Sequence, residues 1–170
     1  MAILRTAKMG NPILRKRSEE VPLDLIKSKD LQRLIRDMVE TMREYQGVGL
    51  AAPQVHEGLR IFTAEIYNEL ELKVVINPVV TLLGNETISN WEGCLSIPRI
   101  RGIVKRPSQV KVEGYDQFGN PQSFEANNYL SAVVQHETDH LDGILFVDKM
   151  DDLKNLSFMD EYLRYHHKDE

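Results

Sequence analysis

The segment His136-Glu137-Thr138-Asp139-His140 contains the residues of this sequence that are best suited to chemistry. Residues four apart lie on one face of a helix, so both imidazoles could bind one metal ion, and the glutamate beside the first histidine could act as a general base. Two of the five histidines of the chain occur here. The segment therefore indicates metal-assisted hydrolysis, although the same spacing also occurs in helices that bind no metal.

The third metal ligand must come from elsewhere, because a catalytic zinc site takes three protein ligands and leaves one position for water. The metzincin pattern would require a histidine where this chain has Phe146, which disfavours that class. Glu161 is the best-placed carboxylate for a gluzincin-like site. Cys94 is the stronger candidate because a thiolate binds zinc or ferrous iron well, although a lone cysteine can also be an inert buried residue.

The helix that carries the two histidines is expected to start at Asn127 or Asn128 and to end near Gly143. Earlier residues on the same face are Tyr129, Ala132 and Val133. An apolar patch beside a catalytic metal could hold an apolar substrate side chain. On spacing alone, the same stripe is more often plain core.

A long N-terminal helix is predicted by apolar residues that recur every three or four positions. Ser28 or Asp30 could cap its start, and Gly47 is placed to end it. The small residues 47–54 that follow predict a loop. The periodic residues are Leu31, Leu34, Ile35, Met38, Val39, Met42 and Tyr45.

The middle of the chain is predicted to consist of strands. Residues 59–66 and 73–83 are rich in β-branched side chains, and a hairpin with its turn at residues 118–120 follows. Pro98 is expected to end the segment that contains Cys94. Because strands dominate the middle and helices lie near both ends, the order of elements predicts an α+β fold.

Composition limits the possible classes of protein. The 170 residues, 42% of them apolar, predict one domain over residues 1–170. A net charge of −5 argues against nucleic-acid binding. No apolar run reaches the ~18 residues that span a bilayer, and no signal peptide is evident, so we expect a cytoplasmic protein without membrane partners. The single cysteine excludes an intramolecular disulfide.

Three segments together resemble the motifs of one family. Residues 47–54, Gly-Val-Gly-Leu-Ala-Ala-Pro-Gln, resemble its motif G-x-G-L-A-A-x-Q. Residues 92–96, Glu-Gly-Cys-Leu-Ser, resemble E-G-C-L-S, and residues 135–143 resemble Q-H-E-x-D-H-L-x-G. All fixed positions match and the order is the same. From about Ile3 to Asp148, the chain is similar to the peptide deformylases.

This resemblance implies removal of the formyl group from the N-terminal formylmethionine of nascent polypeptides, with release of formate. It implies an α+β fold in which β-sheets surround the metal-binding helix. It also implies that Cys94, His136 and His140 hold one divalent metal, with Fe2+ as the native ion and Zn2+ or Ni2+ able to occupy the site.

The resemblance also implies the catalytic roles. Glu137 would take a proton from water and pass it to the leaving amine. The Gln54 side-chain amide and the Leu95 backbone N–H would donate hydrogen bonds to the oxyanion. Taken without the other motifs, Gln54 is better explained as an amide that ties its loop together.

The expected substrate path follows from the same motifs. The peptide would run as an extended strand beside Val48 and Gly49. Tyr129, Ala132 and Val133 would line the methionine pocket, with Val48 and Glu92 at its rim. Tyr129 is bulkier than the aliphatic residue expected there, and it could reshape or gate the pocket mouth.

Two arginines are also given roles by the resemblance. Arg101 corresponds to a family arginine near the bound peptide, but it could equally be an exposed charge that aids solubility. Arg106 could pair with Glu92 and brace the cysteine loop.

Residues 151–170 form a short acidic tail with three Lys or Arg against six Asp or Glu. Its apolar residues could form a short amphipathic helix. Some relatives dock on the ribosome through a basic C-terminal helix, and this tail puts that mode in doubt. Two alternatives stay open: a metallopeptidase with Glu161 as its third ligand, and a non-enzymatic module with a structural metal.

Overall fold

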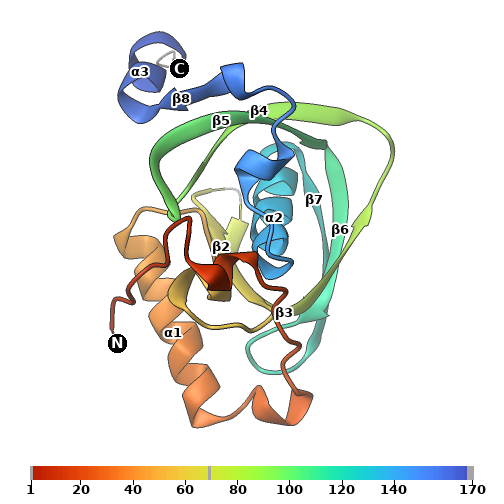
Figure 1. Cartoon of the computed structure of the whole chain (residues 1–170). Helices are drawn as coiled ribbons and strands as arrows, with labels where there is room; N and C mark the ends of the chain where they lie inside the picture. Colours follow the sequence, from red (N-terminus) through yellow and green to blue (C-terminus); the bar gives the residue numbers. More distant parts are fainter. Residues whose placement is uncertain (1, 69, 168–170) are drawn as a thin grey trace.

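Two antiparallel sheets surround the central helix α2 (Asn128–Leu141) in the computed structural model, which describes residues 2–68 and 70–167 (Figure 1). The five-stranded sheet has the order β1-β2-β3-β6-β7, and the three-stranded sheet has the order β4-β5-β8. Helix α2 contacts strands of both sheets. The predicted α+β class, with β-sheets around the central helix and a long N-terminal helix, is confirmed.

The remaining elements follow one another closely along the chain. The strands are β1 (Gly49–Ala51), β2 (Ile61–Ile66), β3 (Leu70–Leu82), β4 (Thr87–Cys94), β5 (Ile97–Pro107), β6 (Gln109–Tyr115), β7 (Pro121–Asn127) and β8 (Leu156–Phe158). The other helices are α1 (Lys29–Glu44) and α3 (Met159–Tyr165). Short 3-10 turns span Pro12–Arg15, Leu23–Leu25, Ala52–Val55, Phe146–Lys149 and Leu153–Asn155.

Helix α1 forms where its apolar periodicity predicts it. The Ser28 hydroxyl accepts the Leu31 N–H at 3.3 Å, so Ser28 is the N-terminal cap. Its buried face, which includes Met38 and Met42, packs into a core cluster with residues of β1 and β2. The Gly47 N–H bonds to the Met42 carbonyl at 2.9 Å and closes the helix end, as predicted.

Helix α2 is held in place by the five-stranded sheet. Val133, Val134 and Leu141 are buried together with Phe62 and Val112 of that sheet. The helix ends before Gly143, whose φ of +75° favours glycine. A Cβ there would also lie 2.8 Å from the Arg15 backbone.

The predicted loop over residues 47–54 is wrong in part, because residues 49–51 form strand β1. Gly49 is the partner of Ala64 in the antiparallel ladder with β2. The pairing is made with a distant segment of the chain, whereas small residues have little strand preference of their own. The predicted strands and the hairpin between β6 and β7 are confirmed.

Two further predictions need correction. Pro98 does not end the structured segment that contains Cys94, because it is the second residue of strand β5. The pairing of β4 with β5 shifts its register between Gly93 and Cys94, close to the start of β5. The amphipathic helix of the tail is shorter than predicted. Residues 156–158 instead pair with β5 as strand β8, and residues 168–170 of the tail lie outside the described part.

None of the helices in the described part of the chain has the length and apolar character that a membrane span requires.

Candidate metal centre and substrate cleft

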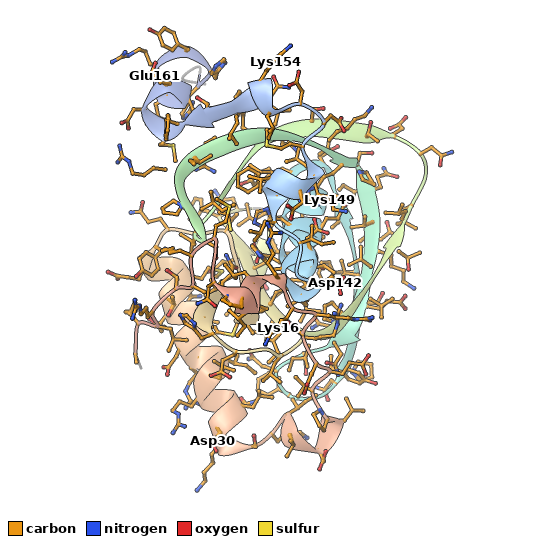
Figure 2. The ribbon with its side chains drawn as sticks, in the orientation of Figure 1. Lys16, Asp30, Asp142, Lys149, Lys154 and Glu161 are labelled. Carbon is orange, nitrogen blue, oxygen red and sulfur yellow. The ribbon has the colours of Figure 1, made fainter. Side chains whose placement is uncertain are left out.

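Cys94, His136 and His140 lie together at the centre of the molecule. Cys94 ends strand β4, and the two histidines are one turn apart on α2. Their potential ligand atoms all lie within 4.8 Å of one another, with 3.2 Å between Cys94 Sγ and His140 Nε2. Glu161, the alternative third ligand, lies on α3 away from α2 (Figure 2) and pairs with Arg164 at 3.6 Å.

The chemistry of this donor set fits a divalent metal. Burial raises the pKa of the Cys94 thiol, but the neighbouring His140 and His136 outweigh it and hold that pKa well below its ordinary value. His136 Nδ1 lies 2.8 Å from Glu92 Oε2, and this hydrogen bond leaves Nε2 as the donor atom for a metal. One thiolate and two imidazoles suit zinc or ferrous iron.

A buried ion network supports His136 from behind. Arg106 donates to both oxygens of Glu92, at 2.5 and 3.0 Å, and to Asp139 at 2.7 Å. Burial raises the pKa of Glu92, but the hydrogen bonds from His136 and Arg106 outweigh it and lower the pKa to about 2. Glu92 is therefore a carboxylate that fixes the imidazole, and the predicted pairing with Arg106 is confirmed.

Glu137 faces the same site and is 4% exposed. Burial raises its pKa to about 7. Its Oε2 is buried with no hydrogen-bond partner among the described residues. Gly49 lies directly against this carboxyl group, since a Cβ there would be 2.7 Å from Glu137 Cδ. The second glycine of the first motif therefore makes room for the glutamate of the third.

Gln54 and Leu95 flank the cysteine. Gln54 Nε2 lies 3.3 Å from Cys94 Sγ, while its Oε1 accepts the Ala51 N–H at 2.8 Å. The amide thus ties its own loop and also presents N–H groups to the site. Lys8 donates to the Leu95 carbonyl at 2.7 Å and braces that peptide unit.

A cleft of about 450 Å³ opens beside the three potential ligands. Every residue predicted to bind substrate lines it, although they come from β1, β4, β5 and α2 and the segment before β1: Val48, Gly49, Glu92, Arg101, Tyr129, Ala132 and Val133. Gln54, Leu95 and Glu137 also line it. The stripe on α2 is therefore a cleft wall as well as core, and Tyr129 is 44% exposed at its end.

Arg101 lies in the cleft and is not an exposed charge. It packs on Gly93, where a Cβ would lie 2.5 Å from its guanidinium carbon, and its Nε is buried with no hydrogen-bond partner among the described residues.

The cleft residues that sequence reasoning missed include Lys8, Trp91, Ile100 and Met159. Trp91 stands directly before the second motif, which is a signal that could have found it. Lys8 and Met159 lie near opposite ends of the chain in segments without a motif, so no local pattern marks them.

Comparison with known proteins agrees with this geometry. Residues 3–156 match the family model described as polypeptide deformylase. A peptide deformylase of Leptospira biflexa is 39% identical over 95% of both chains, and one of Pelotomaculum thermopropionicum is 42% identical over 92% of this chain and 97% of its own.

Solved structures give the same result. A peptide deformylase of Thermotoga maritima has a TM-score of 0.83 and 37% identity, covering 89% of this chain and 100% of its own. A class I type b peptide deformylase of Acinetobacter baumannii, solved with Met-Ala-Ser bound, has a TM-score of 0.84 and 34% identity, covering 88% of this chain and 99% of its own. The chain therefore belongs to the peptide deformylase family, and it is a metal-dependent hydrolase that removes the formyl group from N-terminal formylmethionine and releases formate.

Proposed function

We propose that Cys94, His136 and His140 hold the catalytic metal and that Fe2+ is the native ion. The observation that carries this proposal is the convergence of one thiol and two imidazoles within 4.8 Å, with His136 oriented by Glu92. When bound, a divalent ion lowers the pKa of water from 15.7 toward ~7 and so supplies a nucleophile at neutral pH. Zn2+ or Ni2+ could also occupy this ligand set.

Glu137 is the proposed general base and acid. Its carboxyl group is buried beside the ligands, and its Oε2 has no partner among the described residues. Burial raises its pKa to about 7, and a divalent cation bound next to it would lower that pKa. Glu137 would then accept a proton from water and deliver it to the leaving amine.

Gln54 and Leu95 are the proposed donors to the oxyanion that forms at the formyl carbon. Gln54 Nε2 reaches toward Cys94 Sγ, and the hydrogen bond between its Oε1 and the Ala51 N–H fixes the plane of the amide. Lys8 donates to the Leu95 carbonyl, which belongs to the peptide unit after the one that contains the Leu95 N–H, and so helps to fix the Leu95 backbone. Such preorganised donors stabilise developing negative charge without reorganising.

The formyl peptide is proposed to extend along β1. This strand lies at the edge of its sheet, and within the described residues it pairs with β2 alone. An extended peptide can add to such an edge through main-chain hydrogen bonds, which suits substrates of varied sequence. The methionine side chain would enter between Tyr129, Ala132 and Val133, with Val48 and Glu92 at the rim. The buried Arg101 Nε–H could donate to a peptide carbonyl.

We place the reaction in the cytoplasm, where nascent chains begin. The tail carries more acidic than basic residues. This charge argues against ribosome docking through a basic C-terminal helix, because ribosomal RNA is itself negatively charged.

Anaerobic purification, metal analysis and a formate-release assay test the proposal together. The wild type should hold one metal per chain and release formate from formyl-Met-Ala-Ser. Cys94→Ala should lose metal affinity, whereas Glu161→Ala should retain both metal and turnover. Metal loss in Glu161→Ala, or wild-type affinity in Cys94→Ala, would place the third ligand elsewhere.

A further inference from the structure

The C-terminal segment forms one side of the cleft, beyond the residues that the family model matches. That match ends at residue 156, and α3 begins at Met159. Met159 is half-buried and lines the same cleft as Ala132 and His136. This part of the cleft wall therefore lies outside the matched family region.

The backbone of the segment is fixed to β5. Strand β8 pairs with it in antiparallel register, with Ile100 opposite Phe158 and Arg101 opposite Ser157. Figure 1 shows β8, in blue, at the edge of the three-stranded sheet beside β5, with α3 following it. Because α3 follows β8 without an intervening loop, this pairing determines where Met159 lies.

Side chains also hold α3 against the mouth of the cleft. Arg99 Nη2 pairs with Asp160 Oδ2 at 2.7 Å. The Tyr162 ring lies 5.1 Å from the Trp91 ring, and the Arg101 guanidinium carbon lies 6.0 Å from the Tyr162 ring centre. These contacts are typical of aromatic and cation–π pairs.

The resulting wall is mainly apolar. Met159, Trp91 and Ile100 all line the cleft. Among the described residues, three cationic Lys or Arg side chains line the cleft. The C-terminal segment engages two of them, Arg99 through Asp160 and Arg101 through the Tyr162 ring, and Lys8 bonds to the Leu95 carbonyl. A substrate side chain that lies here would exchange water for apolar surface, which favours large apolar groups.

The alternation of side chains along an extended peptide indicates which residue lies there. Successive side chains of a strand point to opposite sides, so the first and third residues face the same way. If the methionine enters the cleft, the third residue also faces it, and the second points away. We infer that the wall of Met159, Trp91 and Ile100 selects formyl peptides with a large apolar third residue. This inference rests on the proposed course of the peptide along β1.

Formate release from formyl-Met-Ala-Leu and formyl-Met-Ala-Ser tests the inference directly. The wild-type enzyme should prefer leucine by about tenfold in kcat/KM, the lower end for apolar pockets because the wall is half-open. The preference should lie in KM, because the wall is remote from the reacting carbon. Exchanging leucine and serine at the second position should change kcat/KM by less than about twofold.

Three variants separate the wall from general effects on folding. Met159→Ala should reduce the leucine preference below about threefold, since it removes one of the three apolar side chains of the wall. Tyr162→Ala, which removes a support of the wall, should reduce the same preference. Leu163→Ala is the matched control: Leu163 is on the same helix, is 51% exposed and does not line the cleft, so the preference should stay at the wild-type value. Circular dichroism and metal content establish that each variant is folded.

Equal release of formate from both peptides by the wild type would overturn the inference and leave the deformylase activity standing. Retention of the leucine preference in both Met159→Ala and Tyr162→Ala would also overturn it. A stronger preference for glutamate than for leucine would show that Arg101, not the apolar wall, determines selection. No formate from any of these peptides would remove the activity on which the inference rests.

Discussion

Replacing Arg106 with methionine tests how the metal ligands are held. The Arg106 side chain is 5% exposed and bonds to Glu92 and Asp139, whose side chains are 8% and 17% exposed. Methionine fills much of the same volume but leaves the buried Glu92 carboxylate without its arginine, while Asp139 keeps only the longer contact to Lys149 at 3.9 Å. Glu92 would then hold His136 less rigidly.

The expected loss of stability is large. Removing one partner of a buried ion pair costs about 3–5 kcal/mol, and a chain of this size loses about 2–4 °C in Tm for each kcal/mol, so Tm should fall by about 6–20 °C. The loss of a group that orients a ligand should also weaken metal binding by about 10–100-fold.

Thermal unfolding of the metal-free protein and a metal-chelator competition measure the two effects separately. Arg164→Met is the matched control: Arg164 pairs with Glu161, and the two side chains are 65% and 51% exposed. An exposed pair contributes about 0–1 kcal/mol, so Tm should move by no more than about 4 °C, with metal affinity unchanged. If Arg106→Met lowers Tm no more than Arg164→Met does, the buried network does not stabilise the site as described.

Three other expectations follow from the site. Gln54→Glu keeps an oxygen for the Ala51 N–H but removes the amide donor, so kcat should fall about 10²–10³-fold with metal retained. A smaller fall in kcat, measured by formate release, would argue against a role for Gln54 in binding the oxyanion. Gly49→Ala should displace the Glu137 carboxyl group and lower kcat without loss of metal. A wild-type kcat in this variant would contradict the close packing of Gly49 against Glu137. The pKa of Glu92 is lowered from 4.5 to about 2, so its contribution to stability is present above pH 4.5 and is lost as pH falls toward 2. The urea concentration at the unfolding midpoint of the metal-free protein should therefore decrease as the pH is lowered from about 5 to about 3. A constant midpoint would contradict the stabilising role of the Glu92 carboxylate.

The sequence predicted the chemistry of this site better than its walls. The two histidines lie on one helix, so helical periodicity alone brings them together. Cys94 comes from a distant strand, and only its motif indicated the role. Strand β1 was missed because its pairing with β2 is long-range and its small residues have weak strand preference. Met159 was missed because its position depends on the pairing of β8 with β5, which no local pattern reveals.

Formate release by metal-loaded Glu137→Ala tests the central claim most directly. The substitution leaves Cys94, His136 and His140 in place, so the variant should retain one metal per chain. It removes the proton acceptor, so release of formate from formyl-Met-Ala-Ser should fall by at least about 100-fold relative to the wild type. Substantial turnover by a fully metal-loaded Glu137→Ala enzyme would contradict the assignment of Glu137 as the base.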